Sequence, residues 1–305
     1  MTRVIVIGGA NVVVKGRTRE AFIAGTSNPA DVVITPGGVS RNIAENLARL
    51  GLDAALTAFV GDDANGRLIR DSCAVAGVDT AMIETCAATT GVYLAILDEG
   101  GELVAAVNDM RAADLVTVDY LRARSDRFAA ADYLIADCNL PTLCLDWLCH
   151  FATEIKVPLL IEPISTPKAM KLLDFARPSP VFAITPNLQQ LEALTGERHT
   201  LSAVTMLHQL GFANIVVHCG KEGAIVSDGV TPAKRLLALP STAVADVTGA
   251  GDAAVAGLVC GLAAGHDFAV SARLGQAAAS IKLGSRNSAA PGISRDSVFA
   301  LAGMA

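Results

Sequence analysis

Basic residues are scarce relative to acidic ones in this chain. Lysine and arginine total 24 against 30 aspartates and glutamates, which gives a formal net charge of −6 and a sequence pI of about 5.4. A protein that follows a nucleic-acid backbone needs a basic surface. The charge balance therefore argues against nucleic acid as a partner and favours a small-molecule ligand.

Disulfide, zinc and membrane signals are also lacking. The seven cysteines are odd in number and include no Cys-x-x-Cys pair, which indicates reduced, buried thiols and favours the cytoplasm. Hydrophobic residues make up 52% of the chain, and the mean hydropathy is +0.45. The longest apolar stretch, 253–265, is still too short to cross a bilayer. Gly8 and Gly9 interrupt the first apolar segment, unlike a signal peptide.

Short apolar or β-branched runs alternate with helical patterns along most of the chain. The expected strands are 4–8, 54–60, 133–136, 158–161, 181–184, 215–218 and 224–227, and the clearest helices between them are 64–76 and 141–153. This alternation predicts an α/β fold, in which helices cover both faces of a mostly parallel sheet. Ligands of such folds bind beyond the carboxyl ends of the strands.

Two segments do not follow this alternation. Residues 15–34 are polar and extended, and residues 91–108 predict a hairpin. Together they are expected to form a small sheet that projects from the core, with lid segments at about 12–35 and 90–109. An exposed sheet edge of this kind favours pairing with a second copy of the chain.

The most informative string is Thr248-Gly249-Ala250-Gly251-Asp252. Its glycines let the backbone approach a ligand closely, and the apolar residues 253–265 predict a buried helix directly after it. A helix N-terminus presents unpaired N–H groups and about half a positive charge, so this turn suits an anion such as a phosphoryl group. Asp252 would lie beside that anion. Alternatively, Thr248 or Asp252 simply caps the helix.

A second glycine-rich turn precedes a helix near the start of the chain. Residues 35–42 read Thr-Pro-Gly-Gly-Val-Ser-Arg-Asn, and Ile43, Leu47 and Leu50 continue at helical spacing. A short motif is weak by itself. The two turns together carry more weight than either one.

With both motifs in this order, the sequence resembles the ribokinase-like (PfkB) carbohydrate and nucleoside kinases over nearly its whole length. The opening strand ends in Gly8-Gly9-Ala10-Asn11, and Asn187 lies where the family places a nucleotide-side asparagine. The resemblance implies one ribokinase-like α/β domain across residues 1–305, with the small sheet as a lid over the sugar and, in many relatives, as the dimer contact. A lid excludes water that would otherwise hydrolyse the phosphoryl donor.

Within the family, four strings are similar to the subgroup that phosphorylates pseudouridine: residues 27–29, 35–42, 108–110 and 136–139. The implied reaction transfers the γ-phosphoryl group of ATP to the 5′-hydroxyl of the free nucleoside, with Mg²⁺ bridging the phosphates. Asp252 is the predicted base. The N–H groups of Gly249, Ala250 and Gly251 are the predicted anion hole, a kind of contribution worth roughly a hundred- to thousandfold per donor.

The resemblance also assigns the binding residues. Those assigned to the substrate are Asn11, Val13, Gly37, Gly38, Asn42, Asp137 and Asn139. Those assigned to the nucleotide are Lys168, Asn187, Gly220, Gly223, Thr248 and Asn287. Gln190 is associated with Mg²⁺, and Asp246 with the monovalent cation, such as K⁺, that many relatives hold near the anion turn. Plainer alternatives stay open: turn residues for Asn11, Asp137 and Asn139, a simple turn for Gly220 and Gly223, and a solvated side chain for Lys168.

Two positions depart from the family pattern. Val13 stands where the family commonly has an aspartate that grips the sugar hydroxyls. Losing such a contact costs about 1.5–3 kcal/mol, or about ten- to a hundredfold in binding. Gln190 occupies the glutamate position of the Asn-x-x-Glu pattern and lacks its charge. These changes leave two alternatives open: a kinase for another sugar or nucleoside, as in ribokinase or fructokinase, and a catalytically weak binding relative that senses its ligand.

Overall fold

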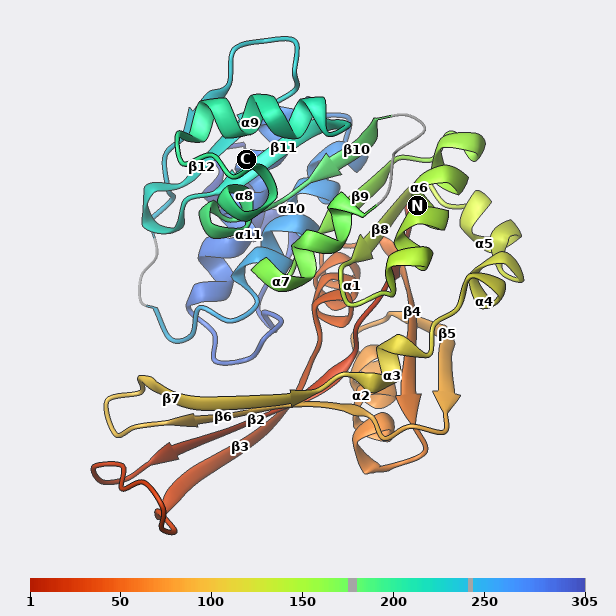
Figure 1. Ribbon diagram of the computed structural model, residues 1–305. Coiled ribbons are helices and arrows are strands. Elements are labelled where there is room, and N and C mark those ends of the chain that lie inside the picture. The colour runs from red at the N-terminus through yellow and green to blue at the C-terminus, as the bar shows by residue number, and fades with distance from the viewer. Residues whose placement is uncertain (175–179, 241–243, 305) are drawn as a thin grey trace.

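The computed structural model describes residues 1–174, 180–240 and 244–304 and contains two separate sheets (Figure 1). The larger sheet has nine strands in the order β13-β12-β11-β10-β9-β8-β1-β4-β5. Neighbours from β11 to β5 are parallel, whereas β12 and β13 are antiparallel. The strands are β1 Arg3–Ile7, β4 Asp53–Gly61, β5 Asp79–Cys86, β8 Tyr133–Asp137, β9 Leu159–Glu162, β10 Val181–Ile184, β11 Phe212–His218, β12 Ala224–Ser227 and β13 Lys234–Leu236. The predicted α/β fold is confirmed.

Helices cover both faces of this sheet because its strands are apolar on both sides. In β1, Val4 and Val6 pack into the core on one face, while Ile5 and Ile7 pack into the core on the other. The helices are α1 Val39–Arg49, α2 Ala64–Val75, α3 Arg111–Asp114, α4 Val118–Arg122, α5 Ser125–Ala129, α6 Thr142–Ile155, α7 Thr166–Ala169, α8 Leu188–Thr195, α9 Thr200–Gln209, α10 Ala250–Ala263, α11 Phe268–Leu283 and α12 Arg295–Leu301. No helix within the described ranges combines the length and the apolar character that a bilayer crossing requires.

The smaller sheet consists of β2 Asn11–Thr18, β3 Ala30–Gly37, β6 Gly91–Leu97 and β7 Leu103–Asp109, in the order β3-β2-β6-β7. Its central pair, β2 and β6, is parallel, and the outer pairs are antiparallel. The expected hairpin forms as β6 and β7, and the sheet projects away from the main body (Figure 1). Strand β5 was not expected from the sequence, because it is an edge strand that is only partly buried.

Helices α10 and α11 approach each other closely through small residues. A Cβ atom at Gly275 would lie 2.6 Å from the carbonyl oxygen of Ala254, and one at Gly257 would lie 2.6 Å from that of Leu274. Gly249 precedes α10 with φ 86°, where a Cβ atom would lie 2.0 Å from the carbonyl oxygen of Ser288. The position of α10, and therefore of the turn before it, depends on these glycines.

We expect Gly275→Ala to destabilise the protein by about 1–3 kcal/mol, because the added methyl group forces backbone apart. The gain in helix propensity, about 1 kcal/mol, offsets only part of that cost. Urea unfolding measures the change. Gly292→Ala is the matched control, since an added Cβ there meets no described atom within 4 Å. Equal stability of the two variants would contradict close packing of α10 and α11.

Candidate active site

A cavity of about 1000 Å³ lies between the smaller sheet, which is the predicted lid, and the carboxyl ends of the parallel strands. Val13 and Tyr93 line it from the lid, and Glu162 and His218 line it from the ends of β9 and β11. Asp252, in the first turn of α10, lies on its wall. The site is therefore where an open α/β sheet binds its ligands.

Asp252 is 7% exposed and accepts a hydrogen bond of 2.6 Å from Asn42 Nδ2. The N-cap of α10 is Gly249, without a side-chain hydrogen bond, so neither Thr248 nor Asp252 caps this helix. The first bond within the helix runs from Ala253 N–H to the carbonyl oxygen of Gly249. The N–H groups of Gly251 and Asp252 precede that bond and suit an anion.

The predicted anion hole needs one adjustment. The N–H group of Ala250 donates to the carbonyl oxygen of Val247 at 3.3 Å, a long bond that keeps this donor within the turn. Gly249, Ala250 and Gly251 all line the cavity. The donors best placed for an anion are thus Gly251 and Asp252 rather than Ala250.

Two buried carboxyl groups share this cavity. Burial raises the pKa of Asp252 to about 7, against the lowering effects of the Asn42 hydrogen bond and the positive charges of Arg41 and Lys282. Burial likewise raises the pKa of Glu162 to about 8, and the negative charge of Asp252 adds to that effect. Asp252 can therefore exchange a proton near neutral pH.

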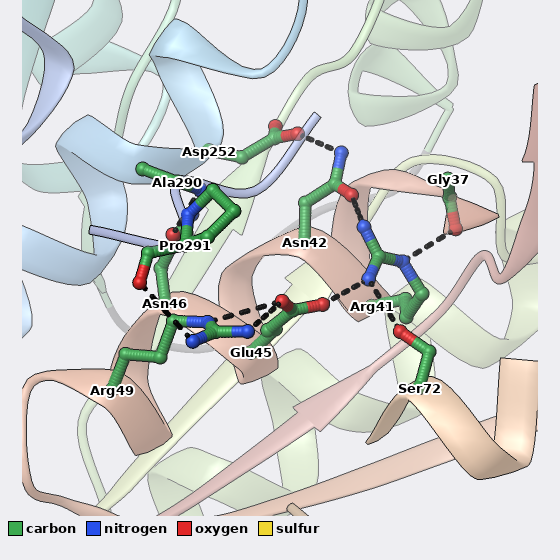
Figure 2. A network of polar contacts seen from close by, with 10 residues as sticks. All are labelled: Gly37, Arg41, Asn42, Glu45, Asn46, Arg49, Ser72, Asp252, Ala290 and Pro291. Atoms are coloured by element: carbon green, nitrogen blue, oxygen red, sulfur yellow. Dashed lines mark hydrogen bonds and ion pairs between the residues drawn. The ribbon is translucent and has the colours of Figure 1, made fainter. Parts of the chain in front are cut away.

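Asn42 is held in place by a polar network on α1 (Figure 2). Arg41 is 1% exposed, donates to the Asn42 amide oxygen and donates to the carbonyl oxygen of Gly37 at 2.9 Å. It also pairs with Glu45, which Arg49 contacts as well. Because Arg41 takes the amide oxygen, the amide nitrogen of Asn42 faces Asp252. Sequence reasoning did not assign Arg41 a role, although it stands inside the second motif.

Asp137 does not line the cavity, and its predicted contact with substrate is revised. Its carboxylate is fully buried and accepts hydrogen bonds from the N–H groups of Gly9, Ser40 and Asn139 and from Ser40 Oγ, at 2.7–3.0 Å. Four donors leave little capacity for a ligand. Asp137 instead joins the end of β1 to the start of α1, and the turn-residue alternative applies to it.

The other residues predicted for the substrate lie at one end of the cavity. Asn11, Val13, Gly38, Asn42 and Asn139 line it. Gly37 lies just behind Val13, because a Cβ atom at Gly37 would be 2.4 Å from Val13 Cγ2.

Residues predicted for the nucleotide separate into two groups. Asn187, Gly220, Gly223 and Thr248 line the cavity, and Gly223 adopts φ 98° after the short 3-10 helix η2, Gly220–Glu222. Asn287 is exposed and is absent from the cavity wall.

Lys168, the remaining residue predicted for the nucleotide, lines the cavity beside Asn139, and its Nζ donates to the Asn139 amide oxygen. Burial lowers the pKa of this lysine. The alternative of a freely solvated surface side chain does not apply, since the side chain is partly buried and bonded.

Sequence reasoning missed two polar residues on the cavity wall, His218 and Gln276. Within the described residues, His218 Nε2 and Gln276 Oε1 are buried without a hydrogen-bond partner. Burial lowers the pKa of His218 to about 4, so its imidazole is neutral. The place of His218 at a strand end was the available signal.

Gln190 and Asp246, the two residues associated with metal ions, already bind other groups of the protein. The Gln190 side-chain oxygen accepts from the N–H of Asn187 at 2.8 Å, and the Asn187 side-chain oxygen accepts from the N–H of Gln190 at 2.9 Å, a capping box at the start of α8. Asp246 forms an ion pair with Lys15, and its carbonyl oxygen accepts from Lys282. Among residues that the structure describes, no three His, Cys, Asp or Glu side chains are grouped as metal ligands.

Known proteins agree with this architecture. A model of the pfkB family carbohydrate kinases matches residues 1–294. A pseudouridine kinase from Escherichia coli (strain K12) is 34% identical over 307 residues, covering 98% of this chain and 96% of that protein. A solved carbohydrate kinase from Agrobacterium tumefaciens is 32% identical with a TM-score of 0.84, covering 100% of this chain and 98% of that one.

A solved structure with lower sequence identity also has a similar fold. The ribokinase of Arabidopsis thaliana, solved with ribose and ATP, is 21% identical with a TM-score of 0.84 and covers 100% of both chains. Its likeness concerns the ribokinase-like fold alone. From the family match and the full-length relatives, the chain belongs to the pfkB family of carbohydrate kinases and is an ATP-dependent phosphotransferase that acts on a sugar hydroxyl.

Proposed function

We propose that the acceptor is pseudouridine, phosphorylated at its 5′-hydroxyl. The observation that carries the proposal is the carboxyl group of Asp252, held by Asn42 at the N-terminus of α10 on the wall of a cavity of about 1000 Å³. The full-length relative named pseudouridine kinase supports this choice of acceptor. The cavity has room for a small ligand at the lid end and a second at the η2 end.

In this mechanism Asp252, as the carboxylate, takes the proton of the 5′-hydroxyl while the hydroxyl oxygen attacks the γ-phosphorus of ATP. The bond between the γ-phosphorus and the bridging oxygen breaks, and ADP leaves. Charge that develops on the moving group faces the N–H groups of Gly251 and Asp252. Asn42 orients the carboxylate and makes no bond to the phosphate.

Mg²⁺ is expected to enter with ATP and to neutralise charge on the phosphates. Glu162 and Asp252 are the acidic side chains among the described residues on the cavity wall, and we assign Glu162 to the metal or its waters. Gln190 suits this task poorly, because its amide oxygen already receives the N–H of Asn187. Its neutral amide stabilises the start of α8 instead.

Val13 and Gln190, the two departures from the family pattern, support two alternative functions. Val13 is 6% exposed on the cavity wall and accepts no hydrogen bond, so a substrate without the usual diol contact would also fit. With Gln190 engaged in its capping box, a weak or inactive nucleoside-binding relative is the further alternative. A cytoplasmic location fits the buried thiols of Cys73, Cys138, Cys144 and Cys260.

An ADP-release assay with pseudouridine, uridine, ribose, fructose and adenosine tests the acceptor. We expect kcat/KM to be highest for pseudouridine, at least about tenfold above uridine, because pseudouridine carries an additional ring N–H that a hydrogen-bonding site can require. A preference for ribose or fructose would overturn the choice of acceptor. No turnover with any of the five would favour the sensing relative.

The rate should follow the protonation of Asp252. With a pKa of about 7, the base is protonated at lower pH, so kcat/KM should fall about tenfold per pH unit below 7 and level off above it. Glu162, with a pKa of about 8, is itself protonated over this limb, so Glu162→Gln should leave the position of the limb nearly unchanged. A profile that is flat from pH 5 to 8 would contradict the assignment.

Asp252→Asn is the matched control for this profile. The amide keeps the shape of the side chain but cannot take the proton, so turnover should fall roughly a hundred- to ten-thousandfold. Binding of the acceptor, measured by calorimetry, should persist. Near-normal turnover would remove Asp252 from the role of base.

We also propose that two copies pair through the lid. The outer strands β3 and β7 expose Val32, Val33, Ile34, Leu103 and Val107. Unpaired strand edges with apolar side chains are suited to association. Analytical ultracentrifugation should give about twice the mass of the 31.3 kDa chain, and a single 31.3 kDa species at micromolar concentration would contradict the pairing.

A further inference from the structure

A buried ammonium group lies behind the anion turn. Lys282, near the end of α11, is 0% exposed, and its Nζ donates to the carbonyl oxygens of Asp246 at 2.7 Å and Ser285 at 3.1 Å. Lysine is almost never fully buried unless it is paired. This charge therefore connects the loop that leads into the turn with the loop that follows α11.

The remaining oxygens of Asp246 also have donors. Oδ2 forms an ion pair with Lys15 Nζ at 2.5 Å, and Oδ1 accepts from the N–H of Thr248 at 2.8 Å. Lys15 comes from lid strand β2 and also donates to Thr248 Oγ1 at 3.1 Å. Asp246 thus faces two ammonium groups and one backbone N–H.

A bare K⁺ ion needs several oxygen ligands to replace its hydration shell. In this loop the carbonyl oxygens of Asp246 and Ser285 already bind Lys282, and the carboxylate already binds Lys15. A cation at this place would be repelled by both ammonium groups. The residues around Asp246 do not fit a monovalent cation site.

We propose that Lys282 takes the place of the monovalent cation in this kinase, so that phosphoryl transfer requires no K⁺. Its ammonium group fixes a positive charge behind the N-terminus of α10 and holds the loop from Asp246 to Thr248 in place. Lys282 does not line the cavity. It acts through this loop and is therefore a positioning residue. The inference depends on the family's kinase activity and not on which sugar or nucleoside is the acceptor.

The direct test compares K⁺ with tetramethylammonium at equal ionic strength, in the unaltered protein. Tetramethylammonium has no N–H and is too large for the loop. We expect the thermal unfolding midpoint to show no K⁺-specific rise, a reading that needs no acceptor. For any acceptor that is turned over, kcat/KM should agree within about twofold in the two salts. A K⁺-specific rise in the midpoint, or a tenfold stimulation by K⁺, would overturn the proposal.

Variants of Lys282 separate its charge from its packing. Lys282→Met keeps an unbranched stem and removes the ammonium, so kcat should fall about ten- to a hundredfold, with KM for the acceptor nearly unchanged. Lys282→Ala also opens space beside the two carbonyl oxygens, so K⁺ or methylammonium should restore part of the rate and raise the unfolding midpoint. Full activity of Lys282→Met without K⁺ would contradict the proposal.

Lys234→Met is the control for loss of one positive charge, since Lys234 is exposed on β13 and does not line the cavity. It should keep both the rate and the indifference to K⁺. If the Lys282 variants do not fold, the comparison of K⁺ with tetramethylammonium in the unaltered protein still tests whether K⁺ is required. Failure to find any acceptor would count against the proposed substrate. The effect of K⁺ on the thermal unfolding midpoint would still test the proposal for Lys282.

Discussion

The hydrogen bond from Asn42 to Asp252 is the contact on which the rest of the site depends. It joins residues 210 positions apart, and so brings together the glycine-rich turn before α1 and the one before α10. A buried carboxyl group is costly when ionised unless donors surround it. Arg41 makes the arrangement specific, because it takes the amide oxygen of Asn42 and leaves only the amide nitrogen for Asp252.

Charge around the anion turn is balanced by residues from distant parts of the chain. Asp252 and Glu162 are buried acids with raised pKa values, which keeps negative charge near the phosphates low at neutral pH. Arg41, Lys15 and Lys282 supply positive charge from α1, the lid and α11. The helix N-terminus adds its partial charge at the same place. A polyanionic ligand is therefore attracted to the turn itself rather than to a basic surface, in keeping with the net charge of −6.

The smaller sheet and the loop before α10 are connected by Lys15. Lys15 reaches from β2 to Asp246 and Thr248, so the smaller sheet also contacts the loop that leads into the glycine-rich turn before α10. Val13 and Gln190, the two departures from the family pattern, lie outside this set of contacts, and their replacement leaves the carboxyl group and its support intact.

The sequence by itself determined the α/β fold, the lid hairpin and the two glycine-rich turns, because strand and helix periodicity and positive-φ glycines are local signals. Through the family motifs it also pointed to Asp252 as the base and to Asn42 as a substrate residue, but not to the contact between them. Only the tertiary structure decided that Asp137 is buried against four donors, that Lys168 donates to Asn139, and that Lys282 binds the carbonyl oxygens of Asp246 and Ser285. These contacts join segments that are far apart in the sequence. They are set by tertiary packing, and neither residue spacing nor composition predicts which distant group a long side chain will bind.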